Sequence, residues 1–276
     1  MPRHLTIIGL GLLGGSIGLG VRKFISDCKI MGCAHRPDSL IHAQQLGAVD
    51  EWTLDIPQAV READLVILCM PVGQIPIWID KIGPHLKPGT VVTDVGSTKA
   101  SICETGAKMS GPGVFVGSHP MAGGEKTGVA CARADLFLGT TCVVTPTPST
   151  DPSAVDRVEA FWTGLGMRVV RHDPKTHDRL VAWISHLPHA VAAAVVGVQT
   201  EASLDLRGKG WTDTTRIAAG DAKLWRDIFM ENRENLIDAI GQLNAELSEL
   251  VQLLRSGNAN AVQDWLSRRA QRRTGL

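Results

Sequence analysis

The first 172 residues alternate short apolar runs with helical segments, and this alternation constrains the fold more than any other feature of the chain. Apolar runs lie at 5–9, 29–34, 65–69, 90–94, 114–117, 142–145 and 167–171, and helical patterns lie at 12–23, 39–46, 59–63, 75–82 and 155–165. The run Leu65–Cys69 is apolar throughout, which is typical of a strand buried on both faces of a sheet. Strands and helices at these spacings predict βαβ units and a mainly parallel, doubly wound α/β sheet.

The pattern changes near Asp173, beyond which the sequence shows no convincing strand. Helical periodicity covers 177–201, with Pro188 inside it, then 223–254 and 261–271. We therefore expect an α/β domain over residues 1–172 and an all-α domain over residues 173–276. The segment 223–254 carries an apolar stripe at three- and four-residue steps, made of Leu236, Ile240, Leu243, Leu247, Leu250 and Leu254. This stripe predicts a homodimer that forms through the helical domain, and the alternative is a core within one chain.

The first apolar run leads directly into the turn G-L-G-L-L-G at 9–14, which opens a helix. In this context the pattern G-x-G-x-x-G is the fingerprint of a Rossmann domain that binds a dinucleotide. Gly9 allows the tight turn, Gly11 lets the backbone approach a pyrophosphate, and Gly14 lets the helix pack close to the strand. Free N–H groups at the helix N-terminus favour phosphate. We predict cofactor contacts from Gly9, Gly11, Leu12, Leu13 and Gly14; a purely structural turn is the alternative.

The segment after the second strand bears on the choice of nicotinamide cofactor. An NAD site usually ends this strand with an acid that accepts hydrogen bonds from the ribose hydroxyls. Here the chain reads Ala34-His35-Arg36, and the first acid, Asp38, follows Pro37. Because an arginine suits a 2′-phosphate, we expect NADP rather than NAD, with His35 and Arg36 among the cofactor contacts. A solvent-exposed basic loop is the alternative.

Composition excludes several functional classes. Lys plus Arg and Asp plus Glu number 28 each, so the chain lacks the basic surplus of a nucleic-acid-binding protein. It contains no tyrosine, which excludes dehydrogenases whose general acid is a tyrosine. The six cysteines form no C-x-x-C pair, so we expect free thiols. By sequence pattern, no stretch approaches the ~18–20 apolar residues of a membrane span. We therefore expect a cytoplasmic protein that binds a small-molecule substrate and contacts neither nucleic acid nor membrane.

Polar residues suited to chemistry gather in two places. The first comprises 93–99 and 117–124, which both follow strands and therefore lie at the carboxyl edge of the sheet, where doubly wound folds bind ligands. The second is Trp183–His189 in the helical half, where His186 and His189 share one helix face. A zinc site at these two histidines would lack obvious third and fourth ligands, so we expect no metal.

Six segments, in chain order, resemble the motif series of the prephenate/arogenate dehydrogenase family. They are G-L-G-L-L-G-G-S at 9–16, D-V-G-S-T-K at 94–99, G-S-H-P-M-A-G at 117–123, S-H-L-P-H at 185–189, D-T-T-R-I-A at 213–218 and W-R-D-I-F at 225–229. The similarity runs from residue 5 to about residue 255, and the middle motifs are the specific ones. The resemblance implies a Rossmann domain followed by a helical dimerisation domain, in agreement with the pattern of elements.

The resemblance also implies a reaction, the oxidative decarboxylation of prephenate or arogenate in tyrosine biosynthesis. Such a substrate is a cyclohexadienol with a ring carboxylate and a 4-hydroxyl group. Hydride passes from C4 to the nicotinamide of NADP or NAD, and the hydroxyl becomes a ketone. Loss of CO2 then makes the ring aromatic, which gives 4-hydroxyphenylpyruvate or tyrosine.

Residue roles follow from the same resemblance. His119 would accept the hydroxyl proton, since a neutral histidine suits this task near pH 7. Ser97 would orient His119 and the hydroxyl, and it is also expected to contact the cofactor. Arg216 would hold a substrate carboxylate through a bidentate contact. Substrate contacts are further expected from His189 at the side-chain end, from His186 in support, and from Trp225 in the pocket lining.

Alternatives exist for the residues and for the whole protein. His119 and Ser97 could shape their loops, Arg216 could form a domain-bridging ion pair, and Trp225 could be a core aromatic. A β-hydroxyacid or imino-acid oxidoreductase shares the domain plan, but the hydroxyacid branch relies on a helical lysine motif that residues 174–276 lack. A catalytically silent dinucleotide sensor would need no such set of polar residues. The sequence leaves open the preference between prephenate and arogenate. We expect no separate feedback-binding domain, and inhibition by tyrosine at the active site stays open.

Overall fold

The computed structural model describes residues 1–123 and 127–275. Within these residues the N-terminal part forms a six-stranded sheet in the order β3-β2-β1-β4-β5-β6, which is the strand order of a Rossmann fold. Its strands are β1 His4–Ile8, β2 Lys29–Cys33, β3 Glu51–Thr53, β4 Leu65–Leu68, β5 Val91–Asp94 and β6 Val114–Phe115. Each strand pairs in parallel with its neighbours. The predicted doubly wound α/β class is confirmed.

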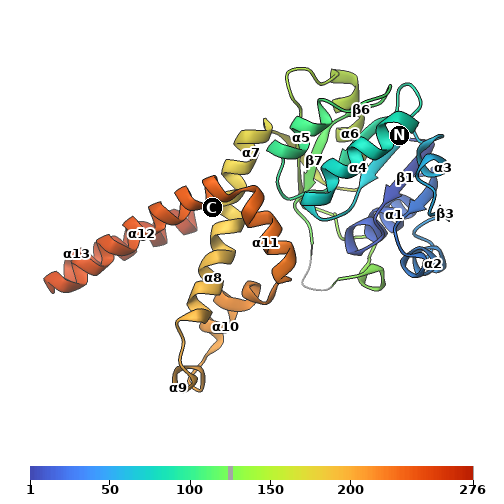
Figure 1. Cartoon of the computed structure of the whole chain (residues 1–276). Helices are drawn as coiled ribbons and strands as arrows, with labels where there is room; N and C mark the ends of the chain where they lie inside the picture. The colour runs from blue at the N-terminus through green and yellow to red at the C-terminus, as the bar shows by residue number, and fades with distance from the viewer. Residues whose placement is uncertain (124–126, 276) are drawn as a thin grey trace.

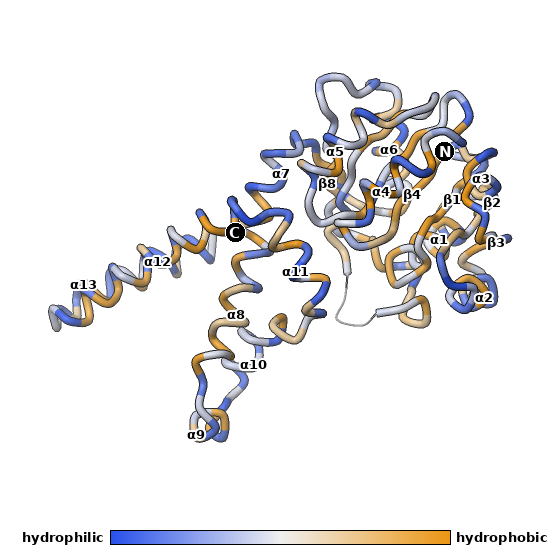
Figure 2. The backbone as a smooth tube through the Cα atoms, viewed as in Figure 1, coloured by the Kyte–Doolittle hydropathy of each residue, from blue (hydrophilic) through white to orange (hydrophobic). Residues whose placement is uncertain are grey.

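Helices cover both faces of this sheet (Figure 1): α1 Leu12–Phe24, α2 Pro37–Gln45, α3 Ile56–Val60, α4 Ile75–Ile82, α5 Ala100–Gly106 and α6 Pro152–Gly164. Successive side chains of a strand point to opposite faces. Ile7 of β1 therefore joins a core with Ile17 and Trp162, whereas Ile8 joins a second core with Val66 and Ile79. Figure 2 shows the apolar segments concentrated in these strands. All six cysteines are free thiols.

A second sheet, which the apolar pattern does not reveal, holds the chain after β6. The run 114–117, expected as one strand, is divided between β6 and β7 Gly117–Pro120. Val116 still donates its N–H to the backbone oxygen of Val92 in β5 at 2.8 Å, whereas Gly117 already pairs with Thr145 in the second sheet. This sheet has the order β7-β8-β9, with β8 at Thr141–Thr145 and β9 at Arg168–Arg171. The sequence pattern also does not predict the short elements β3 and α5, because neither shows a clear periodicity.

From Pro174 onward the described chain is helical. Its elements are α7 Pro174–Val181, the π-helical η4 Ala182–His186, α8 Leu187–Gly197, α9 Glu201–Leu204, α10 Lys209–Thr215, the 3-10 turn η5 Arg216–Ala219, α11 Ala222–Glu231, α12 Arg233–Ser256 and α13 Ala259–Thr274. The segment 223–254, expected as one helix, is divided between α11 and α12 at Asn232. The division arises because Asn232 is buried and its side chain donates to groups on α7 and η4.

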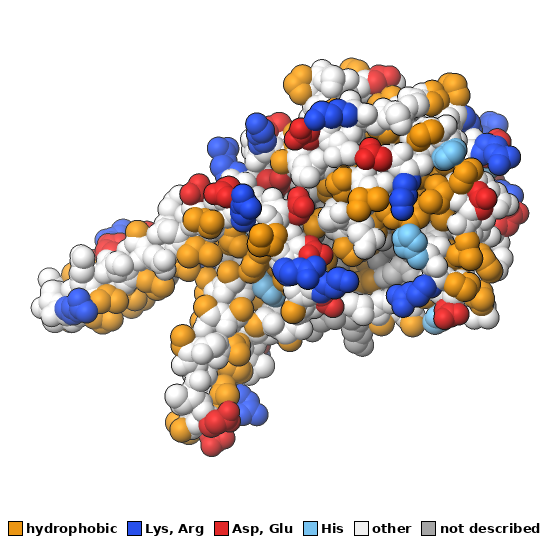
Figure 3. Space-filling model, viewed as in Figure 1, with side chains coloured by type: hydrophobic (Ala, Val, Ile, Leu, Met, Phe, Trp, Pro, Cys, Tyr) orange, Lys and Arg blue, Asp and Glu red, His pale blue; other side chains and the backbone are white. Residues whose placement is uncertain are grey.

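Two arms extend from the junction with the α/β domain (Figure 1). One arm contains α8, α9 and α10. The other is a hairpin in which α13 returns along α12, with Trp265 Nε1 donating to Glu249 at 3.2 Å. Figure 3 shows hydrophobic side chains along both arms. Between them lies a groove of about 610 Å³ lined by Trp183, Leu187 and Leu243 and by arginines of α13. Much of the apolar surface of the helical part is therefore uncovered in a single chain.

One helical run contradicts the expectation that no segment is apolar enough to span a membrane. The run Pro174–Gly197 has 24 residues, and its most apolar window has a mean hydropathy of 1.5 and is 28% buried. The sequence pattern suggested an interruption at Pro188, but this residue lies in the first turn of α8, where proline is tolerated. The run nevertheless carries four buried polar side chains, which belong to the site described next: His177, Asp178, His186 and His189.

Candidate active site

The turn after β1 is closely packed on one side and open on another. Gly9 has a φ of +97°, and a Cβ there would lie 2.2 Å from the carbonyl oxygen that follows β4. A Cβ on Gly14 would lie 2.0 Å from the Gly9 oxygen, so α1 packs directly on the turn. Among the described atoms, none lies within 4 Å of the place where Gly11 would carry a Cβ. Leu12 and Leu13 form the first turn of α1, whose N–H groups are suited to a phosphate.

His35 and Arg36 lie close to this turn, at the carboxyl end of β2. The connection is direct, because the Gly9 N–H donates to the Cys33 oxygen at 2.8 Å. Both His35 and Arg36 are exposed. The ring of His35 packs edge-on against Trp78, with 5.0 Å between the ring centroids. The structure therefore places two exposed basic side chains where a Rossmann fold receives the adenosine ribose.

A buried ion pair holds the loop after β5. Lys99 Nζ pairs with the carboxylate of Asp94, and both side chains are 0% exposed. Lys99 also donates to the Ser118 oxygen at 3.0 Å. Asp94 accepts from two further backbone N–H groups, at 2.8 and 3.1 Å. Such additional hydrogen bonds are needed to offset the desolvation of a buried pair. The pair thereby fixes the loop that carries Ser97 against β7, the strand that carries His119.

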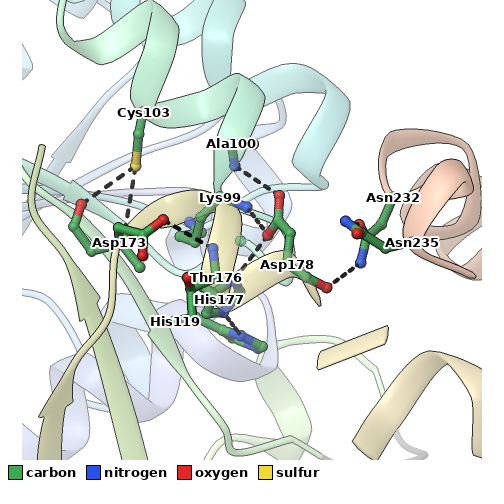
Figure 4. Close-up of polar contacts among 12 residues, drawn as sticks. Lys99, Ala100, Cys103, His119, Asp173, Thr176, His177, Asp178, Asn232 and Asn235 are labelled. Carbon is green, nitrogen blue, oxygen red and sulfur yellow. Dashed lines mark hydrogen bonds and ion pairs between the residues drawn. The ribbon is translucent and has the colours of Figure 1, made fainter. Parts of the chain in front are cut away.

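A chain of hydrogen bonds connects His119 with α7 and α5 (Figure 4). His119 Nδ1 lies 2.9 Å from His177 Nε2, and His177 Nδ1 lies 2.8 Å from Asp178 Oδ1. The Asp178 carboxyl group accepts the backbone N–H of Lys99 at 2.7 Å and that of Ala100 at 2.8 Å. A residue of the second sheet, the first helix of the helical part and the N-terminus of α5 are thus joined in one network.

This network bears on the role expected of Ser97. Ser97 is partly buried in the loop after β5, but among the described residues it makes no hydrogen bond to His119. The Nδ1 atom of His119 is bound by His177 instead. His177 therefore orients the His119 ring from its Nδ1 side, and an additional orienting role of Ser97 stays a prediction. Contacts of Ser97 with the substrate hydroxyl and with the cofactor stay predictions.

Four buried residues of the network were not predicted as site residues from the sequence. Asp94 and Lys99 lie inside the D-V-G-S-T-K segment, where an acid and a lysine directly after an apolar strand are a signal that could have been used. His177 and Asp178 stand in a helix that begins with several polar residues, so their sequence looks like a solvated face. Their exposed fractions of 1% and 3% depend on packing against β7 and α5.

The predicted histidines of the second group lie on η4 and α8. His186 Nδ1 lies 3.1 Å from Asn232 Nδ2, which also donates to the backbone oxygen of Asp178 at 2.7 Å. The ring of His189 stacks on Trp225 with a centroid distance of 3.6 Å and an angle of 13°. Among the described residues, the buried Nδ1 atom of His189 has no hydrogen-bond partner. Such an atom is costly to leave unpaired, so it marks a position where a ligand can bind.

Arg216 begins η5, and the segment that carries it packs against this stack. The turn ends at Gly220, where a Cβ would lie 2.6 Å from Trp225 Nε1 and 3.2 Å from His189 Cε1. Arg216 itself is exposed. The structure therefore brings the end of the segment that begins with Arg216 next to His189 and Trp225. Among residues 1–123 and 127–275, no group of three or more His, Cys, Asp and Glu side chains could hold a metal ion.

Burial dominates the electrostatics of the four site histidines. Desolvation by burial is the main cause that lowers the pKa of His119 well below its ordinary value, and the Lys99 ammonium adds to this shift. Burial also lowers the pKa of His177, although the Asp178 carboxylate opposes this shift. It lowers the pKa of His186 to about 4 and also lowers the pKa of His189. The four imidazoles are therefore neutral near pH 7, and His119 is able to accept a proton.

Comparisons with known proteins cover both halves of the chain. The family model described as "Prephenate dehydrogenase, nucleotide-binding domain" matches residues 17–171, and that described as "Prephenate dehydrogenase, dimerization domain" matches residues 173–268. A prephenate dehydrogenase from Bacillus subtilis is 31% identical over 285 residues, which cover 100% of this chain and 76% of the relative.

Two solved structures are similar over nearly the whole length. Prephenate dehydrogenase from Aquifex aeolicus, in complex with hydroxyphenyl propionate and NAD+, has a TM-score of 0.92 and 33% identity, covering 99% of this chain and 97% of the other. Synechocystis arogenate dehydrogenase has a TM-score of 0.86 and 28% identity, covering 99% of this chain and 100% of the other. The similarity therefore extends through both the sheet and the helical arms.

Proposed function

This chain belongs to the prephenate dehydrogenase family, and we propose that it catalyses the NAD(P)-dependent oxidative decarboxylation of prephenate, arogenate or both in tyrosine biosynthesis. The observation that carries the proposal is the position of His119. Its imidazole is neutral, its Nδ1 atom is engaged by His177, and it lies in β7, the strand to which Asp94 and Lys99 tie the loop after β5. The β-hydroxyacid or imino-acid oxidoreductase and the silent sensor are not favoured, because the family similarity covers both halves of the chain.

The residues after β1 fit a nicotinamide dinucleotide. The open side of Gly11 and the uncapped N-terminus of α1 form a cradle for the pyrophosphate. When bound, the cofactor supplies the acceptor for the hydride that leaves the substrate. We propose a preference for NADP, supported by the exposure of His35 and Arg36 and by the absence of an acid at Ala34. The guanidinium of Arg36 offers the fork of donors that a 2′-phosphate requires.

The site residues have separate tasks in this proposal. His119 accepts the proton of the 4-hydroxyl group at Nε2 as the ketone forms. The C–C bond to the ring carboxylate then breaks, its electrons complete the aromatic ring, and His119 returns the proton to the 4-oxygen. Ser97 contacts the same hydroxyl and the cofactor. Arg216 holds a substrate carboxylate, and the unpaired Nδ1 of His189 binds the side-chain end. Trp225 keeps His189 in place through the stack, and His186 supports α8 through Asn232.

A spectrophotometric assay tests this function. The parent protein is assayed at 340 nm with prephenate, arogenate and 3-hydroxyisobutyrate, each with NAD+ and with NADP+. We expect turnover of at least one of the first two substrates, with release of CO2 in equal amount to the reduced cofactor. Turnover of 3-hydroxyisobutyrate alone would assign the protein to the hydroxyacid alternative. Binding of a dinucleotide without any turnover would favour the sensor.

We also propose a homodimer that forms through the helical domain. Large apolar side chains of both arms are exposed in the single chain, including Val198 at 77%, Leu206 at 87%, Ile237 at 60% and Leu254 at 59%. Exposed apolar surface of this kind marks an interface in a soluble protein. The predicted stripe is only partly available for it, because Leu236 is 5% exposed and packs within its own chain.

The dimer accounts for the apolar run Pro174–Gly197 without a membrane. Its buried polar residues bind β7, the start of α5 and Asn232 between α11 and α12, and transfer of this run into lipid would break those contacts. We therefore propose a cytoplasmic enzyme whose apolar helices are covered by the second subunit. We place the boundary between its two domains at residues 172 and 173, in the link between β9 and α7.

A further inference from the structure

We infer that His177 and Asp178 form a relay that fixes the proton on Nδ1 of His119, so that Nε2 faces the substrate as a base. The inference rests on the proposed function of His119 and deepens it. His177 is thereby a positioning residue, because it acts through His119 and does not touch the substrate.

The hydrogen bonds determine which atom carries each proton. Each carboxyl oxygen of Asp178 accepts a backbone N–H, from Lys99 at 2.7 Å and from Ala100 at 2.8 Å, so the group acts as an acceptor-only carboxylate. His177 Nδ1 must therefore donate to it. In a neutral imidazole the other nitrogen is an acceptor, so His177 Nε2 accepts from His119 Nδ1. The same rule leaves the lone pair of His119 on Nε2.

Packing makes this arrangement rigid. His177 is 1% exposed and Asp178 is 3% exposed. Asp173 caps α7 by accepting the Thr176 N–H at 3.0 Å, and Asn232 binds the backbone oxygen of Asp178 at 2.7 Å. The relay is thus anchored at the start of α7, at the start of α5 and at the junction of α11 and α12. A rotation of the His177 ring would break both of its hydrogen bonds.

The surrounding charges explain why the carboxylate matters. When His119 takes the substrate proton at Nε2 it becomes an imidazolium, and its Nδ1–H continues to donate to His177. The Lys99 ammonium contributes to lowering the pKa of His119 but is paired with Asp94. His186 on η4 is neutral, since burial lowers its pKa to about 4. The Asp178 carboxylate, two hydrogen bonds away, therefore offsets the charge that develops on His119.

Two substitutions at His177 separate the relay from a purely structural role. In His177→Gln the amide oxygen keeps an acceptor for His119 Nδ1–H, whereas His177→Leu removes the acceptor. We expect kcat to fall ~10–100-fold in the Leu variant, which is part of the contribution of a general base, and to fall much less in the Gln variant. Loss of the acceptor also lowers the pKa of His119 further, so the acid limb of the kcat–pH profile moves to lower pH in the Leu variant.

The control is His172→Gln, the same substitution at an exposed histidine five residues earlier. It is expected to keep the parent profile. A Leu variant with the parent kcat and acid limb overturns the relay. Equal losses in the Gln and Leu variants also overturn it, since the acceptor would then be irrelevant.

A measurement on the unsubstituted protein needs neither activity nor a stable variant of His177. Nitrogen-15 NMR of the imidazoles, with the His119 signals assigned by their loss in His119→Asn, reports the tautomer directly. We expect a proton on Nδ1 and none on Nε2 at pH 7. The opposite tautomer overturns the relay. Absence of turnover with prephenate and arogenate, together with the expected tautomer, would instead count against the proposed function alone.

Discussion

Gly220 offers a test of the stack between His189 and Trp225 that leaves every polar group in place. The residue follows η5 with a φ of −61° and a ψ of 158°, a conformation that alanine adopts without strain. Substitution by alanine therefore changes the space beside the stack and not the backbone. A Cβ would lie 2.6 Å from Trp225 Nε1, 3.0 Å from Trp225 Cδ1 and 3.2 Å from His189 Cε1.

The size of the effect follows from these distances. Carbon and nitrogen atoms in contact are normally separated by about 3.5 Å, so the Trp225 ring has to move by roughly 1 Å. Displacement of a substrate-positioning group by this amount costs up to about 100-fold. Because His119 and its relay lie on other elements, we expect the loss to appear in KM. We predict a rise in KM for prephenate or arogenate of about 5- to 50-fold, with kcat changed less than about threefold.

Steady-state kinetics of Gly220→Ala and of Gly210→Ala check this prediction. Gly210 lies in α10, and no described atom lies within 4 Å of its possible Cβ, so alanine there is neutral or slightly stabilising. The thermal midpoint of both variants is measured in parallel. A Gly220→Ala enzyme with the parent KM and the parent midpoint would show that the stack does not position His189 for the substrate.

Four further outcomes are expected. His119→Asn lowers kcat by about 10²–10⁴-fold with little change in the Kd of the cofactor measured by fluorescence, and a near-normal kcat would remove His119 from the mechanism. The unsubstituted enzyme has a higher kcat/KM with NADP+ than with NAD+, and Arg36→Ala abolishes this difference. A parent kcat/KM with NAD+ that equals or exceeds the value with NADP+ contradicts the role of Arg36. Arg216→Ala raises KM by roughly 10- to 150-fold, which corresponds to about 1.5–3 kcal/mol for a hydrogen bond to a charged group. Arg216→Lys recovers only part of this loss. If Arg216→Ala binds substrate as well as the parent but melts at a lower temperature, the role of Arg216 is structural. Sedimentation at micromolar concentration gives twice the chain mass of 29.6 kDa, whereas a monomer would overturn the proposed interface.

Much of the α/β domain could be predicted from the sequence because its signals are local. A strand buried on both faces is apolar at every position, as in Leu65–Leu68, and such a run is visible without knowledge of its neighbours. The glycine turn is equally local, since the conformation of Gly9 and the close contact of Gly14 involve residues within the motif and the adjacent strand. The resemblance to a family added the roles of His119, Arg216, His186 and His189. Periodicity and spacing alone do not reveal these roles.

The arrangement of the site was decided by tertiary structure. His119 and His177 are 58 residues apart in the chain, and Lys99 and Asp178 are 79 apart. In sequence, His177 and Asp178 look like part of a solvated helix face, and they become buried because α7 packs against α5 and β7. The division of the long helix at Asn232 has the same origin, because the bonds of its side chain to Asp178 and His186 involve residues 54 and 46 positions away. Local patterns determine which segments form strands, helices and turns, whereas the proton pathway depends on contacts that exist only after these segments have packed together.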